Sequence, residues 1–220
     1  IKICVNHSYR FSNQYNFLKK ILKLKKFGNI VSINLIGGNQ GISMNGVHFF
    51  DILKFLTQSK AVKVFSNVKI DRNINPRGKK FKDYEGQVSI INKNGTRGYI
   101  DLSSKAGHGE TLTCVCKYGV ILIDLYTGRM TINYRKEKFR KFSTVYYGKP
   151  FISQNMRIKI SDTSEITMLN LDKFLKNKDY VKLSESIEIT KILISTIEAS
   201  FKKKWININT LRSNKNFDWA

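Results

Sequence analysis

Four segments of the chain carry apolar residues at the three- and four-residue spacing of an amphipathic helix. The first follows Ser12, a residue type that caps helices, and stops at Gly28. The second opens at Asn45-Gly46-Val47-His48, and the third at Asp162, which has Glu165 three residues on as in a capping box. The apolar positions of the four predicted helices are Phe17, Leu18, Ile21, Leu22 and Leu24; Phe49, Ile52, Leu53 and Leu56; Ile166, Leu169, Phe174 and Leu175; and Ile189, Ile192, Leu193, Ile197 and Phe201.

Other segments show the β-branched runs and two-residue alternation of strands. Ile1–Val5, Asn29–Ile36 and Ala61–Ile70 are predicted as strands, and residues 71–82, which hold Pro76 and Gly78, as a surface loop. Tyr84–Tyr147 is predicted as an antiparallel meander. Its clearest turns are Asn92–Gly95 and Tyr126–Gly128.

The meander leaves apolar surface to bury. Met130, Ile132 and Tyr134 alternate with Thr131, Asn133 and Arg135, but Val120–Leu125 is apolar on both faces apart from Asp124. Two closing helices cannot cover a sheet of that size, which predicts self-association through one sheet face. Together these elements predict a single α+β domain.

The chain is strongly basic. Its 220 residues carry 39 Lys and Arg against 16 Asp and Glu, a net charge of +23. Three explanations stay open: a bias toward Lys, Asn and Ile, a polyanionic small substrate, or nucleic acid. The basic residues are scattered, which favours the first. No apolar stretch reaches the ~18 residues of a membrane span.

Three cysteines, Cys4, Cys114 and Cys116, form no framework of pairs, which favours a reducing, cytoplasmic location. Cys114 and Cys116 leave the same face of a predicted strand and are expected to be buried thiols rather than metal ligands. No metal site is predicted. The chain begins with Ile1 inside an apolar strand, as though cut in mid-protein.

The most informative local pattern is the glycine-rich segment Gly37–Gly41 followed by Asn45–Asp51, an Asn-Gly-x-His-x-x-Asp element that opens a helix. This pattern resembles the C-terminal domain of the Gfo/Idh/MocA family of NAD(P)-dependent oxidoreductases. Three other segments agree in order: Val5–Phe11 is similar to the family's junction out of the nucleotide domain, Lys19–Ile33 to a helix and strand, and Ile187–Ile208 to the closing helix and strand.

The resemblance implies an open, mostly antiparallel sheet with helices packed on one face. It also implies that residues 1–11 are a strand remnant and junction, and that residues 12–220 form a substrate-binding and oligomerisation domain. NAD or NADP would be bound mainly by an N-terminal Rossmann domain that these residues lack. Neither Gly37–Gly41 nor Gly107–Gly109 has the GxGxxG spacing that a dinucleotide site requires.

His48 is the predicted catalytic residue, because it matches the family histidine that acts with an upstream lysine. An imidazole with a pKa of ~6.5 can accept the hydroxyl proton while hydride leaves carbon. The family often has Asp four residues earlier, where this chain has Met44. His7 and His108 are expected to be structural or exposed.

Four further residues are candidates for substrate binding: Asn45, Asp51, Tyr9 and Arg10. Each has a structural alternative. Asn45 can be an ordinary turn residue and Asp51 a helix cap or fold residue. Arg10 can bind a substrate carboxylate or phosphate, or form an ion pair.

The leading functional hypothesis is the C-terminal part of an oxidoreductase that transfers hydride between NAD(P) and a sugar, nucleotide-sugar or polyol hydroxyl. This chain alone would then be inactive. The alternative is a non-enzymatic oligomeric binding or scaffold domain, and a basic nucleic-acid-binding domain is a weaker third.

Overall fold

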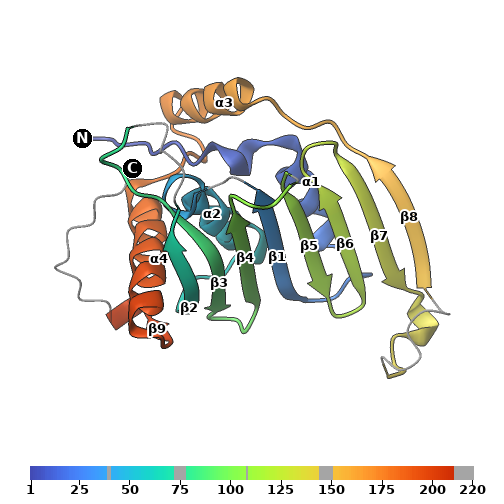
Figure 1. Ribbon diagram of the computed structural model, residues 1–220. Helices are drawn as coiled ribbons and strands as arrows, with labels where there is room; N and C mark the ends of the chain where they lie inside the picture. Colours follow the sequence, from blue (N-terminus) through green and yellow to red (C-terminus); the bar gives the residue numbers. More distant parts are fainter. Residues whose placement is uncertain (39–40, 72–77, 108, 144–150, 211–220) are drawn as a thin grey trace.

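The computed structural model describes residues 1–38, 41–71, 78–107, 109–143 and 151–210. Within them, nine strands form one sheet in the order β8-β7-β6-β5-β1-β4-β3-β2-β9 (Figure 1). The strands are β1 (Ile30–Gly38), β2 (Ala61–Ile70), β3 (Tyr84–Asn92), β4 (Arg97–Ser103), β5 (Thr111–Cys116), β6 (Gly119–Asp124), β7 (Arg129–Arg135), β8 (Phe151–Arg157) and β9 (Ile206–Asn207).

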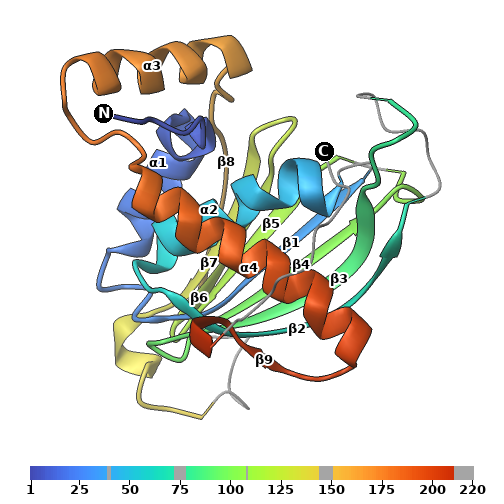
Figure 2. The same cartoon turned by 90° about the vertical axis from the view of Figure 1, so that its left-hand side faces the viewer.

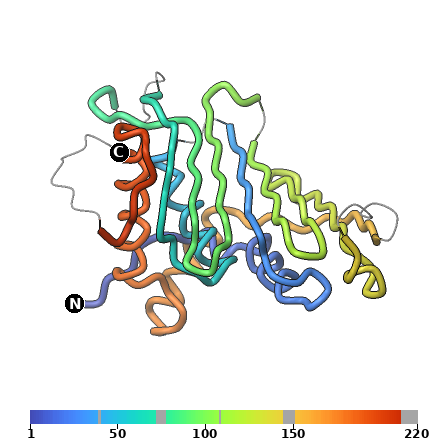
Figure 3. Tube along the Cα trace, turned by 90° about the horizontal axis from the view of Figure 1, so that it is seen from below, coloured from blue at the N-terminus to red at the C-terminus, as the bar shows by residue number. Residues whose placement is uncertain are grey.

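Helices cover one face of this sheet. Four α-helices are described: α1 (Asn13–Leu22), α2 (Val47–Thr57), α3 (Thr163–Leu175) and α4 (Leu183–Lys202). Figures 2 and 3 show α1, α2 and α4 together on one side of the sheet, with the other side left open. This confirms the predicted α+β class, an open and mostly antiparallel sheet with helices on one face. Helix α3 lies outside this layer, against the 3₁₀ turn Ser8–Phe11.

The core lies between these helices and the sheet. On α2, Phe49 and Phe50 are 2% and 1% exposed, and on β1, Ile33 and Leu35 are both 3% exposed. These residues belong to one continuous cluster that extends from α1 to α4. The chain therefore closes a core with its own residues.

The predicted meander is wrong in one respect. Strand β1 pairs with β4 in parallel and with β5 antiparallel, so β4 and β5 are not neighbours. Hydrophobic alternation shows which residues share a face, but it carries no information on which strands pair. Residues 144–147 of the predicted meander lie outside the described residues.

Local predictions at the chain ends also need correction. Ile1–Val5 is not a strand, because its pairing is limited to one bridge between Cys4 and Lys182. In α3, Ile166 is buried as expected, but Leu169 and Leu175 are 40% and 73% exposed, since this helix lies outside the layer on the sheet. Phe201 is 64% exposed in the last turn of α4.

Three smaller predictions concern turns and caps. Asp162 caps α3 by accepting a hydrogen bond from the Ser164 backbone N–H at 2.8 Å. Ser12 precedes α1, but its side chain forms no cap hydrogen bond. Gly37 and Gly38 extend β1 and are not a loop.

No helix among the described residues is long and apolar enough to cross a bilayer.

Candidate active site

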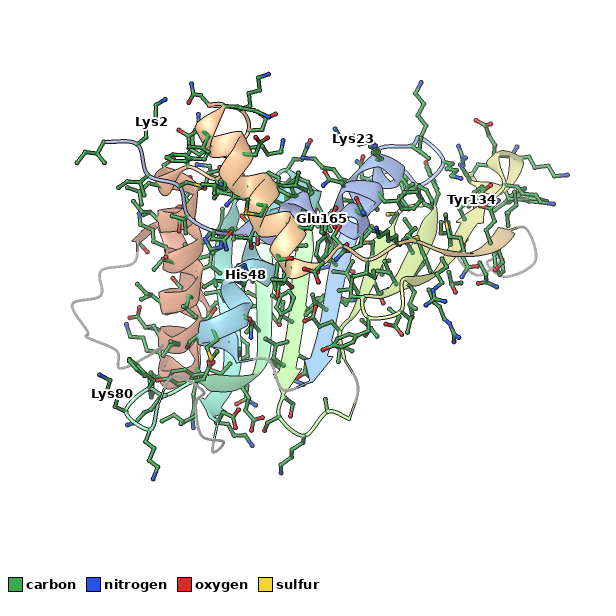
Figure 4. All side chains as sticks on the ribbon, turned by 90° about the horizontal axis from the view of Figure 1, so that it is seen from above. Lys2, Lys23, His48, Lys80, Tyr134 and Glu165 are labelled. Atoms are coloured by element: carbon green, nitrogen blue, oxygen red, sulfur yellow. The ribbon has the colours of Figure 1, made fainter. Side chains whose placement is uncertain are left out.

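His48 lies in the first turn of α2, directly after the single π turn Ile42–Gly46 that follows β1 (Figure 4). Its ring stacks on Tyr9, with centroids 4.5 Å apart and planes 19° from parallel. The His7 ring meets it edge-on at 5.6 Å. The structure therefore brings the junction segment and the start of α2 together, as a shared site for Tyr9 and His48 requires.

Burial sets the protonation state of the His48 ring. Desolvation, with a smaller contribution from nearby His7, lowers the pKa of His48 to about 4. Its Nδ1 atom is buried and has no hydrogen-bond partner among the described residues. The ring is thus neutral near pH 7, and its pKa lies below the ordinary value expected from the sequence. An unpaired buried ring nitrogen costs about 1–3 kcal/mol, and a substrate hydroxyl is one group that could satisfy it.

We expect NMR titration of the His48 ring protons to give a midpoint near pH 4 instead of 6.5. The unfolded chain then binds this proton at a higher pH than the folded chain does. Stability should therefore fall as the pH drops from about 6.5 to about 4, by on the order of 3 kcal/mol from this group. An ordinary midpoint near 6.5 would show that the ring is exposed to water.

The turn just before α2 is held by Asp83, a residue that gave no signal in the sequence. One carboxylate oxygen of Asp83 accepts the backbone N–H groups of Ser43 and Tyr84, both at 2.7 Å, and the other accepts that of Met44 at 3.3 Å. A Cβ atom on Gly41 would lie 1.6 Å from this carboxylate. Asp83 therefore positions the segment just before His48 and requires glycine at position 41.

Arg10 and Asp51 bind each other. Arg10 Nε donates to Asp51 Oδ2 at 2.9 Å, and a second guanidinium N–H contacts Asp51 Oδ1. The Asp51 side chain is fully buried, and Arg10 also contacts Glu185 of α4 at 3.3 Å. Of the alternatives open for these residues, the structure shows the ion pair, which fastens the junction segment to α2 and α4.

His7 is structural in this arrangement. It is 6% exposed, and its Nε2 lies 3.1 Å from the Ser186 hydroxyl of α4. Asn45 lies in the π turn, where its backbone N–H donates to the Gly41 carbonyl at 2.8 Å. His108 lies outside the described residues.

Known structures share this fold. The super-repressor mutant of Gal80p from Saccharomyces cerevisiae superposes with a TM-score of 0.71 at 11% identity, over 96% of this chain and 66% of that chain. A levoglucosan dehydrogenase in complex with NADH and levoglucosan gives 0.70 at 12% identity, over 94% and 66%. The scyllo-inositol dehydrogenase from Lactobacillus casei, with bound NAD(H) and scyllo-inositol, gives 0.63 at 13%, over 96% and 66%.

The fold is that of the C-terminal domain of Gfo/Idh/MocA-type oxidoreductases. The chain spans about two thirds of the length of the neighbours it matches, 66% in each of these three cases. Its sequence matches no protein-family model and no curated protein.

In this Gfo/Idh/MocA-type fold, a second group of titratable side chains lies near the Tyr9 ring. Burial raises the pKa of Glu110, the residue before β5, to about 7. Burial, then the proximity of Glu110 and Tyr126, raises the pKa of Tyr9 to about 12, so this phenol stays protonated. Glu110 could not be recognised from the sequence, because a lone glutamate before a strand gives no sign of burial.

The turn before α2 does not fit a dinucleotide. A Rossmann site needs glycine so that a pyrophosphate can approach free backbone N–H groups at a helix start. Here the Asp83 carboxylate fills the space beside Gly41 and accepts the N–H groups of Ser43 and Met44. An incoming pyrophosphate would meet a negative charge and N–H groups that are already bonded.

The described residues contain no group of three or more His, Cys, Asp or Glu side chains arranged to hold a metal ion. All three cysteines are free thiols. Cys114 and Cys116 are buried as predicted, and burial raises the pKa of each thiol, to about 12 for Cys116. Cys4 is only half-buried.

Proposed function

We propose that this chain is the substrate-binding part of an oxidoreductase that moves a hydride between NAD(P) and the hydroxyl-bearing carbon of a sugar, nucleotide sugar or polyol. The observation that carries the proposal is the His48 ring at the start of α2, stacked on Tyr9 and kept neutral by a pKa that burial and, to a smaller extent, His7 lower. The neighbours support it, since two of them are a levoglucosan and a scyllo-inositol dehydrogenase with bound nicotinamide cofactors. The dinucleotide would be held outside these 220 residues.

The residues of this chain would act on the substrate side of the reaction. A neutral imidazole accepts a hydrogen bond from a substrate hydroxyl, and it can take that proton as the carbon–hydrogen bond breaks. The stacked Tyr9 ring fixes the plane of His48, and the Asp83 carboxylate fixes the turn before it. The nicotinamide would supply the hydride acceptor. Asn45, in the same turn, would offer an amide to a neighbouring hydroxyl.

The proposal is tested on the complete gene product. We expect a GxGxxG strand-turn-helix followed by Glu-Lys-Pro in the reading frame upstream of Ile1. We further expect reduction of NAD or NADP, followed by nicotinamide absorbance, with at least one member of a panel of aldoses, inositols and nucleotide sugars. Absence of both the upstream motif and any turnover would reject the proposal.

A non-enzymatic role is the second candidate. Two observations favour it: Met44 stands where the family often has an acidic residue, and one structural neighbour is a mutant of Gal80p described as a super-repressor. In that case the complete protein would bind a sugar or dinucleotide without turnover. Ligand binding detected by calorimetry together with no nicotinamide reduction would support this alternative.

We expect this 220-residue chain by itself not to bind NAD or NADP with micromolar affinity. The reason is the occupied turn beside Gly41, where Asp83 takes the place that a pyrophosphate would need. Isothermal titration with each dinucleotide measures this directly. Micromolar binding of either one by the chain alone would contradict the expectation.

We also expect the open sheet face to pair with a second copy. One cross-strand row on this face runs through Tyr99, Asn34, Thr113 and Leu122, and both Tyr99 and Leu122 are more than 40% exposed. Ile36, also on this face of β1, is 56% exposed. Sedimentation at micromolar concentration should therefore detect a dimer.

Leu122→Asp should convert this dimer to a monomer, because it places a charge in the middle of the proposed contact. Met168→Asp, at a position 63% exposed on α3, is the matched control and should leave the dimer intact. A monomeric unmodified chain, or equal effects of the two substitutions, would show that the sheet face is not the contact.

A further inference from the structure

A groove lies at the opposite end of β1 from His48. Ile30, the first residue of β1, lines it, whereas His48 follows the other end of this nine-residue strand. Helix α2 joins the two places, since His48 lies in its first turn and Leu56 and Thr57 near its end line the groove; at ~1.5 Å per residue these positions are roughly 13 Å apart. The groove has a volume of about 630 Å³ and runs between the ends of α1 and α2 and the turn after β3. It is therefore separate from the candidate active site.

The groove is positively charged. Lys19, Lys23 and Lys25 line it, and no Asp or Glu is found among the described residues that do so. Five lysines elsewhere have carboxylate partners: Lys54 and Lys60 both contact Glu188, and three further pairs are Lys69–Glu85, Lys176–Asp172 and Lys202–Glu198. A bias toward lysine accounts for the number of positive charges, but not for three of them around one cavity without an acid.

Lys19 is more than a solvated surface charge. Its ammonium group lies 3.8 Å from the centre of the Phe55 ring. Burial, then the positive charges of Lys23 and Arg10, lowers the pKa of Lys19, and Asp179 opposes this only weakly. An anion in the groove would relieve the repulsion between these like charges.

Polar side chains complete the lining. Asn29, Gln58 and Asn94 also line the cavity. The Asn94 Oδ1 atom accepts the Thr96 backbone N–H at 3.1 Å, which leaves its NH₂ group to donate elsewhere. An anion would thus find neutral donors as well as lysines.

The ends of α1 and α2 oppose an anion, since a helix C-terminus carries roughly half a negative charge. Several of the backbone carbonyl groups near these helix ends already accept hydrogen bonds. The Lys20 and Ile21 carbonyls accept N–H groups from the turn after α1, and the Leu53 and Lys54 carbonyls accept the Thr57 hydroxyl and the Gln58 N–H. Three full positive charges therefore outweigh what remains of the two helix dipoles.

We propose that this groove binds a small polyphosphate anion, such as a pyrophosphate or triphosphate group. Three cations around one concave site match several negative charges on one compact ligand. A nucleic acid strand would instead need a stripe of cations with open aromatic faces, and the nearby Phe55 face is occupied by Lys19. The proposal does not depend on the proposed catalytic function.

The test uses this 220-residue chain, which closes its own core, and inorganic tripolyphosphate as the probe. Titration in about 0.15 M salt suppresses diffuse attraction beyond ~8 Å. The test variant is Lys19→Gln/Lys23→Gln/Lys25→Gln. The control, Lys79→Gln/Lys80→Gln/Lys82→Gln, removes the same charge from exposed positions; Figure 4 shows Lys23 and Lys80 on opposite sides of the molecule.

We expect saturable binding with one site, weakened at least ~10-fold in the groove variant and less than ~2-fold in the control. Backbone NMR shifts should centre on the ends of α1 and α2. Absence of saturable binding, or equal weakening by both variants, would overturn the proposal. Tighter binding of a single-stranded oligonucleotide that both variants weaken equally would indicate a diffuse nucleic-acid surface instead.

Discussion

If the proposed function is correct, replacing His48 by alanine is expected to lower the turnover of the complete enzyme by at least ~100-fold, since loss of a general acid–base group typically costs ~100-fold to ~10,000-fold. The upstream lysine that the family resemblance implies would retain part of the proton transfer, which favours the lower end of that range. Dinucleotide affinity should change little, because the described residues near His48 offer no pyrophosphate site. Steady-state kinetics and calorimetry on the same preparation separate the two effects.

Asn45→Ala, in the turn just before the helix that carries His48, is the matched comparison. An amide donates and accepts hydrogen bonds but transfers no proton near neutral pH, so this variant should raise KM more than it lowers kcat. The pH profile gives a second readout. Unchanged turnover and pH profile after His48→Ala, across several sugars, would show that the acid–base assignment is wrong and favour the non-enzymatic alternative.

Much of the secondary structure follows from periodicity. Ala61–Ile70 is a strand with the predicted ends, and α2 buries all four of its predicted apolar positions. Both segments combine a clear period with a partner that covers most of the apolar face, although Ile70 at the end of the strand is 46% exposed. Helix α3 has a helical period as well, but it lies off the sheet, and Leu175 stays exposed. A pattern identifies the apolar face without showing how far its neighbour extends.

The candidate site was predictable where residues are close in sequence. His48, Asn45 and Asp51 were placed together because they occupy one short motif. Asp83 was not, since its hydrogen bonds to Ser43 and Met44 join residues about forty positions apart. Only the β3–β4–β1 order brings the start of β3 beside the end of β1, and that order depends on the parallel pairing that alternation does not encode.

The buried ion pair between Arg10 and Asp51 leads to the largest expected effect on stability. Asp51→Ala removes the carboxylate that satisfies the guanidinium, and the Arg10 side chain is only 12% exposed. Breaking a buried pair from one side typically costs about 3–5 kcal/mol. Urea unfolding should show this loss. Lys60→Ala, at a side chain 68% exposed that contacts Glu188, should cost less than about 1 kcal/mol.

A double substitution separates the charge from the packing. Arg10→Met with Asp51→Leu removes both charges and keeps apolar volume, so it should recover most of the stability lost in Asp51→Ala. If Asp51→Ala cost no more than Lys60→Ala, the pair would not hold the junction segment against α2. That result would also remove the reason for Tyr9 to stay stacked on His48, because both Tyr9 and Arg10 belong to the 3₁₀ turn that the pair fastens.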